Sequence, residues 1–111
     1  MPSIKIETSA VLSKAQEQAL ALEAGKIVSA LLNKPLPVIQ VRVQSGMTVA
    51  FGGEIADASA YVAIALIGKI APETRPLLPG KFTELLARYG EEPRKVFLNY
   101  TETDADAWGW I

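Results

Sequence analysis

The chain has 111 residues and a mass of 11.9 kDa, enough for one domain with one hydrophobic core, which we expect to span residues 1–111. Its 11 Lys and Arg nearly balance 12 Asp and Glu, and the basic residues are spread singly, which argues against nucleic acid as a partner. Cysteine and histidine are both absent, which excludes disulfides, thiolate metal sites and a histidine general base.

The first half of the chain has the pattern of a strand, a helix and a second strand. Residues 3–8 alternate between apolar and polar side chains, as a half-buried strand does. Ser13 and Gln16 form a capping-box pattern, after which apolar residues recur at helical spacing until Asn33-Lys34-Pro35 ends the helix. Residues 38–43 alternate again and predict the second strand, so this half reads as one βαβ unit.

The second half repeats this order. Residues 58–66 are an apolar run without charges, typical of a strand covered on both faces. Residues 82–89 keep a helical period that ends at Gly90, whereas the prolines of residues 72–80 predict an irregular or kinked segment before that helix. Residues 96–100 supply the last strand.

Two tandem βαβ units predict an α/β (α+β) fold, with a four-stranded mixed sheet and two helices on one face. The other sheet face then has no cover within the chain, so we expect self-association through it. Residues 48–51 and 107–110 are candidates for edge strands that pair with neighbouring subunits.

The chain shows no signal peptide pattern and no run of the roughly 18 apolar residues that a membrane span needs. We therefore expect a cytoplasmic protein without a membrane partner, and leave open secretion by a route that needs no signal peptide.

Pro2 is the candidate catalyst because removal of Met1 would leave its secondary amine at the head of the first strand. An α-amino group has an ordinary pKa of about 7.7 to 8.0, which an apolar pocket or a nearby cation lowers. Such an amine is a base near neutral pH. The alternative is a proline that merely follows the initiator and has no chemical role.

Several short motifs stand in the order and spacing of one family. They are Met1-Pro2, Asn33-Lys34-Pro35, Ala50-Phe51-Gly52-Gly53, Leu66-Ile67-Gly68-Lys69-Ile70, Val96-Phe97-Leu98-Asn99-Tyr100 and Gly109-Trp110. On these motifs the chain resembles the macrophage migration inhibitory factor family of the tautomerase superfamily, over nearly its whole length.

The resemblance implies a homotrimer whose sheets surround a central channel, with an active site at each subunit boundary. It also implies cofactor-free keto-enol tautomerisation of small α-keto acids such as phenylpyruvate, with the amine of Pro2 shuttling the proton. Lys34 would pair with the substrate carboxylate and help to keep the amine neutral, and the backbone N–H of Ile67 would donate a hydrogen bond. Phe97 and Asn99 would line the pocket from the adjacent subunit.

The chain departs from the family pattern at three places. Val38 and Phe97 stand where vertebrate members have tyrosines, so the pocket loses two hydroxyl groups, which would alter substrate choice or rate. Residues 58–61 stand where those members have Cys-x-x-Cys, which excludes thiol-disulfide oxidoreductase activity. The prolines of residues 72–80 are unusual for the family's second helix.

Several of these residues, and some others, also have purely structural explanations. Lys34 is also suited to a helix C-terminus, and Asn99 to a strand end. Phe97 would more often be a core residue. Arg42 either attracts anions or is an ordinary surface arginine. The acidic residues Glu102, Asp104 and Asp106 would share one solvated face if extended, with metal binding a distant second explanation.

Two other functions remain open. A superfamily decarboxylase or hydratase would use the same Pro2 amine, but it needs further arginines and carboxylates around Pro2 that the sequence does not place. An interaction protein, comparable to the cytokine role of vertebrate members, would show little or no catalysis. Neither a metal nor a cofactor is expected for any of them.

Overall fold

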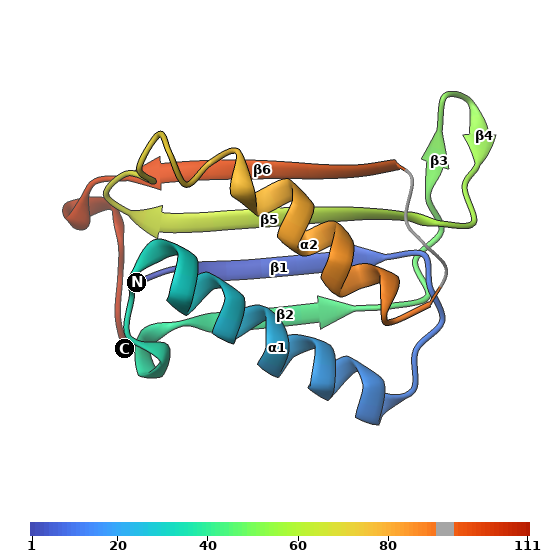
Figure 1. The fold of residues 1–111 in the computed structure, drawn as a ribbon, viewed down its shortest axis with the longest axis horizontal. Helices are drawn as coiled ribbons and strands as arrows, with labels where there is room; N and C mark the ends of the chain where they lie inside the picture. The colour runs from blue at the N-terminus through green and yellow to red at the C-terminus, as the bar shows by residue number, and fades with distance from the viewer. Residues whose placement is uncertain (91–94) are drawn as a thin grey trace.

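A computed structural model describes residues 1–90 and 95–111 of the chain. Its main sheet has the strand order β2-β1-β5-β6, built from β1 (Ser3–Thr8), β2 (Gln40–Gln44), β5 (Ser59–Ile67) and β6 (Lys95–Thr103). The helices α1 (Lys14–Leu32) and α2 (Leu77–Ala87) lie side by side on one face of this sheet (Figure 1). The short strands β3 (Ala50–Phe51) and β4 (Glu54–Ile55) form a hairpin at one end of it.

The pairing of the strands confirms the predicted mixed sheet of two βαβ units. β1 runs parallel to β2, with Ser3 opposite Gln40, and β5 runs parallel to β6. β1 and β5 join the two units in antiparallel fashion, with Ser3 opposite Ala65. The described chain therefore has the α/β architecture expected from its periodicities.

Alternation along β1 determines which side chains face the helices. Ile4 and Ile6 are fully buried and pack in one core with Val62 of β5 and Phe82 of α2. Burying such a side chain contributes about 1.5–3 kcal/mol each, which is why the apolar side of every strand turns toward the helices. The opposite sheet face carries Ser3, Lys5 and Glu7 of β1, and neither helix covers it (Figure 1). We call it the bare face.

The ends of α1 follow from local sequence signals. The Ser13 hydroxyl accepts from the backbone N–H of Gln16, and the Gln16 side chain accepts from the backbone N–H of Ser13, which confirms the predicted capping box. At the other end Asn33 has a φ of 52°, in the left-handed region that asparagine tolerates, and the chain leaves the helix there. Lys34 follows directly.

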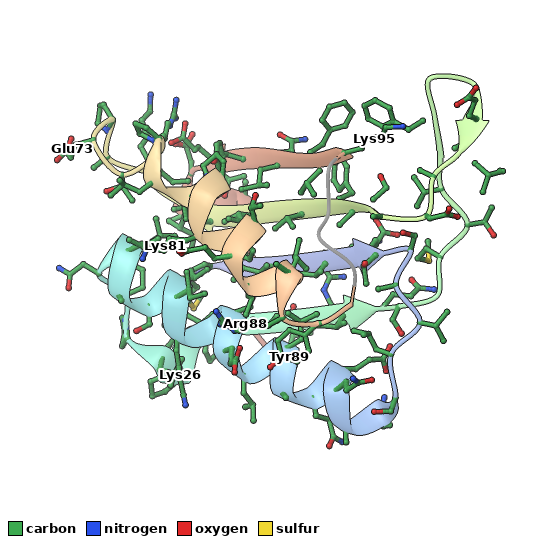
Figure 2. All side chains as sticks on the ribbon, turned by 45° about the vertical axis from the view of Figure 1, so that its right-hand side comes forward. Lys26, Glu73, Lys81, Arg88, Tyr89 and Lys95 are labelled. Carbon is green, nitrogen blue, oxygen red and sulfur yellow. The ribbon has the colours of Figure 1, made fainter. Side chains whose placement is uncertain are left out.

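The second helix differs from its prediction because it begins earlier. α2 starts at Leu77, inside the stretch predicted to be irregular, and Pro79 is its third residue. The backbone nitrogens of the first helical turn have no intrahelical acceptor, so a proline there costs no hydrogen bond. The helix ends at Ala87, and its last turn is tied to α1 by the ion pair of Arg88 with Glu23, at 3.0 Å; Figure 2 shows Arg88 and Tyr89 over α1.

Two further strands differ from their predictions. The second strand begins at Gln40, because residues Leu36–Val38 form the short 3₁₀ helix η1. The predicted edge strand at 48–51 is reduced to β3, which pairs with β4 of the same chain. Gly52 and Gly53, with φ of 63° and 81°, form the turn between them, in a backbone conformation that glycine adopts without steric cost. Residues 107–110 form no strand within the chain, and pairing with a neighbouring subunit stays a prediction.

The prediction that Glu102 lies on a solvated acidic face is wrong. Its carboxylate, only 19% exposed, accepts from the backbone N–H of Ile70 at 2.7 Å and pairs with Arg75 at 2.6 Å. Asp104 and Asp106 lie beyond the end of β6, at the 3₁₀ helix η2 (Ala105–Ala107), so the three residues do not share one extended strand. Within the described residues, no helix combines the length and apolar character that crossing a membrane requires.

Candidate active site

The N-terminus and the C-terminus lie at the same end of the sheet, where β2 begins (Figure 1). A cleft of about 580 Å³ opens there, and its lining includes Met1, Pro2, Val38 and Arg42. The C-terminal residues from Trp108 onward also line it. The cleft therefore brings together the start of the chain, the start of β2 and the last residues.

Pro2 is held at the cleft by the two strands beside it. Its side chain is fully buried, and its carbonyl accepts a hydrogen bond from the backbone N–H of Gln40 at 3.1 Å. That bond extends the parallel β1–β2 pairing by one step beyond Ser3. The structure includes Met1, so the nitrogen of Pro2 is an amide here, and removal of Met1 would turn it into a free amine at this position.

The charge environment of the chain end favours a neutral amine. The pKa of the Met1 amino group lies below its ordinary value of 8.0, first because burial disfavours the ammonium form, and second because Lys34 places a positive charge nearby. Lys34 is positioned by its backbone, whose N–H donates to the carbonyl of Ser29 at 3.2 Å and whose carbonyl accepts from the Ser29 hydroxyl at 2.6 Å. The end of α1 thus brings the charge of Lys34 close enough to lower the pKa of the N-terminal amine, although Lys34 is not among the residues that line the cleft.

Val38 and Ile67 take different places relative to the cleft. Val38, the last residue of η1, lines it with an apolar side chain. Ile67 is the last residue of β5, and continuing the antiparallel register from Ser3 and Ala65 brings it opposite Met1. Ile67 does not line the cleft in the single chain, so it lies beside the site.

Phe97 and Asn99 lie far from Pro2 within one chain. Phe97 is opposite Tyr61, which is itself opposite Glu7 of β1. Glu7 is five residues along the strand from Pro2, a distance of about 16 Å. No side chain of one chain spans that distance, so a role for Phe97 in the site requires a second subunit.

The surroundings of Phe97 also exclude its interpretation as a core residue, since it is 60% exposed on the bare face. Its ring packs against that of Phe51 with centroids 5.3 Å apart, and the ammonium of Lys95 lies 5.6 Å from the centre of the Phe51 ring. Figure 2 shows Lys95 at the end of the sheet near the β3–β4 hairpin. Asn99 donates through its side-chain nitrogen to the Tyr61 hydroxyl at 3.0 Å.

Several cleft residues were not among the predicted site residues. Arg42 and Gln40 lie on the polar side of β2, and parallel pairing with β1 puts them on the same face as Ser3. Alternation alone predicted their shared side of the strand, but not which strand would be their neighbour. Trp108 and Trp110, expected at a subunit contact, line the cleft of their own chain.

The chemistry available at the cleft is that of an amine, cations and aromatic walls. Within residues 1–90 and 95–111, no three or more Asp or Glu side chains gather in a way that could hold a metal ion. A basic amine with a cation nearby suits proton transfer on a small organic anion.

The two βαβ units in one four-stranded sheet, with a cleft at the start of β1, form the fold of the tautomerase superfamily. A family model described as "Macrophage migration inhibitory factor (MIF)" matches residues 1–111, and the chain belongs to that family. Among curated proteins, none matches this chain.

Solved structures agree with the family. A macrophage migration inhibitory factor-like protein of Entamoeba histolytica is 24% identical, with 99% of this chain and 95% of that chain covered and a TM-score of 0.88. The macrophage migration inhibitory factor of Toxoplasma gondii is 25% identical over 97% of this chain and 95% of that one, with a TM-score of 0.87. The protein Pt0534, crystallised after inactivation by 2-oxo-3-pentynoate, is 14% identical over 97% and 90%, with a TM-score of 0.84. At these identities the likeness establishes the fold.

Proposed function

We propose that this protein is a cofactor-free keto-enol tautomerase of small 2-oxo acids, of the phenylpyruvate type, with the amine of Pro2 as its acid-base group once Met1 is removed. One observation carries the proposal. The chain end lies in a cleft, and burial and Lys34 both lower the pKa of its N-terminal amine from the ordinary value, which favours the neutral, basic form.

In the proposed reaction the neutral amine of Pro2 removes a proton from the carbon next to the carbonyl of the 2-oxo acid. The C–H electron pair becomes the carbon-carbon double bond of the enol, and the carbonyl oxygen receives a proton from the resulting ammonium. Lys34 pairs with the carboxylate of the substrate and stabilises negative charge as it develops on the oxygen. Neither oxidation nor reduction occurs, so no cofactor is needed.

The proposed active unit is a homotrimer in which Phe97 and Asn99 reach the cleft of a neighbouring chain. Its support is the separation of about 16 Å between Phe97 and Pro2 within one chain, estimated from the rise of a strand. Further support comes from the exposure of Phe97 and from the bare face that neither helix covers. Such an assembly is also typical of the family.

The reagent 2-oxo-3-pentynoate offers a direct test, because its alkyne is conjugated to a ketone and accepts nucleophiles. We expect incubation with the chain that lacks Met1 to add one equivalent at Pro2, read by peptide mass spectrometry, and to abolish phenylpyruvate tautomerisation in parallel. The chain that keeps Met1 is the control and should resist both effects. Modification of lysines in place of Pro2, or full turnover by a processed Pro2→Gly variant, would refute the role of the amine.

The decarboxylase and hydratase alternative has less support. Such an enzyme needs both arginines and carboxylates around Pro2. Among the described residues that line the cleft, Arg42 is present but no Asp or Glu side chain is. Product analysis with a panel of 2-oxo acids and their unsaturated analogues separates these reactions from tautomerisation.

A further inference from the structure

Arg42 lies in the wall of the cleft, and among residues 1–90 and 95–111 it has no ion-pair partner. In the parallel ladder it stands directly opposite Lys5, and both side chains lie on the bare face. Like charges that face each other across two strands are destabilising. Lys5 has a counter-charge in Glu7 at 3.7 Å, whereas Arg42 forms no ion pair with any described residue.

The groups around Arg42 are those that would hold an anion. Gln40 lies two residues before Arg42 on the same side of β2, and its side-chain oxygen accepts from the hydroxyl of Ser3, directly opposite, at 2.7 Å. The Gln40 amide nitrogen therefore remains as a further donor. Trp110 of the same cleft supplies apolar surface beside these polar groups. The terminal residue Ile111 also lines the cleft, but its carboxylate forms no ion pair with Arg42 in the described structure.

Lys34 and Arg42 flank the chain end from different elements. Lys34 follows α1 and acts on the Met1 amine, whereas Arg42 lies on β2 and is not among the charges that shift the pKa of that amine. Arg42 stands opposite Lys5, three residues along β1 from Pro2, which corresponds to about 10 Å of strand. Two cations that reach the chain end from different segments suit a ligand with two separated negative groups.

We propose that the cleft binds 2-oxo acids with a second carboxylate, and that Arg42, assisted by Gln40, holds that second carboxylate. Lys34 then pairs with the carboxylate next to the reacting carbonyl. A guanidinium matches a carboxylate with two parallel hydrogen bonds, which makes Arg42 the specificity-determining residue of this pair. The reaction part rests on the proposed function, but the binding preference can be measured without turnover.

A binding experiment uses acids that do not react. Glutarate and butyrate differ by one carboxylate, and isothermal titration of the chain lacking Met1 should show that glutarate binds about tenfold more tightly or better. Arg42→Met should remove this advantage, Arg42→Lys should retain part of it, and Lys26→Met, an exposed lysine of α1, should leave it unchanged. Equal binding of the two acids, or an advantage that survives in Arg42→Met while circular dichroism shows native folding, would overturn the inference.

A kinetic experiment separates this inference from the proposed function. The ratio of kcat/KM for oxaloacetate to kcat/KM for phenylpyruvate should fall about tenfold or more in Arg42→Met, mainly through KM, and should stay constant in Lys26→Met. If neither acid is tautomerised but glutarate binding depends on Arg42, the proposed function fails and the dicarboxylate site stands. If phenylpyruvate is tautomerised but Arg42 makes no difference to glutarate, only this inference fails.

Discussion

At the residue scale, the two influences on the N-terminal amine act in the same direction. Burial and the charge of Lys34 both disfavour the ammonium form, so both lower the pKa of the amine from its ordinary value of 8.0. A general base works only while it is unprotonated, so each influence extends the working range of the amine toward lower pH. Lys34 has a second use, because the same charge can pair with a substrate carboxylate.

Replacing Lys34 by methionine therefore separates these uses. In a processed Lys34→Met chain the pKa of the Pro2 amine should rise, and the acidic limb of the pH profile of kcat/KM should move to higher pH. At neutral pH we also expect kcat/KM for phenylpyruvate to fall about tenfold or more, since a charge-assisted contact with the carboxylate is lost. Lys26→Met is the matched control, and an unchanged acidic limb in Lys34→Met would show that this charge does not govern the amine.

At the element scale, α1 was predictable because its signals are local. The capping box of Ser13 and Gln16 and the left-handed end at Asn33 involve residues within a few positions of one another. α2 was less predictable, since its prolines argue against a helix interior and only its first-turn position makes Pro79 acceptable. Residues 91–94, just after the predicted helix end at Gly90, lie outside the described residues.

The capping box makes a stability prediction. Ser13→Ala removes the acceptor for the Gln16 N–H and should lower the free energy of unfolding by about 1 kcal/mol in urea denaturation. Ser13→Asp keeps an acceptor and adds a favourable charge at the helix N-terminus, so it should match the parent chain or exceed it. Equal losses in both variants would mean that the cap does not stabilise α1.

The connection from β5 to α2 is held by Glu102, and this contact depends on pH. Hydrogen bonds from Arg75 and from the backbone of Ile70 lower the pKa of Glu102 from its ordinary value of 4.5. When folding lowers the pKa of a carboxylate, the ionised group stabilises the folded state. This stabilisation is complete above the pKa of the unfolded state and is lost as the pH falls through the lower pKa of the folded state.

Glu102→Gln should therefore lower the thermal midpoint at pH 7, and the difference from the parent chain should shrink below about pH 4 as the parent carboxylate is protonated. The control is Glu84→Gln, because Glu84 forms an exposed pair with Lys81 at 3.8 Å that should contribute little. Calorimetry from pH 3 to pH 7 measures both variants. A constant difference across this range would contradict the role of the charge.

At the scale of the whole molecule, the helices cover one face of the sheet and leave the bare face open. The proposed trimer explains why that face carries exposed apolar side chains. Phe97 is 60% exposed there, next to the half-buried Phe51, in a pattern typical of a surface that another chain covers. Within the trimer proposal this contact also completes the active site.

Phe97→Asp should therefore dissociate the trimer and abolish turnover together, because burying a carboxylate in a subunit contact is costly. Sedimentation should show three chains of 11.9 kDa for the parent protein and a single chain for the variant. Leu22→Asp is the matched control: Leu22 is 69% exposed on α1, away from the bare face, and should keep the trimer. A parent chain that sediments alone at assay concentrations would contradict the assembly.

The sequence by itself determined the two βαβ units, the capped helix α1, the position of Pro2 and Lys34 and the family resemblance, because these depend on periodicity and on neighbours close in the chain. Only the tertiary structure decided the register of the strands and the edges at which the two units join. The pairing of β2 with β1 puts Arg42 and Gln40 on the face of Ser3, and the end of the chain closes the cleft over Pro2. Such contacts join residues dozens of positions apart, and they are chosen by burial of the whole core, which no short stretch of sequence contains.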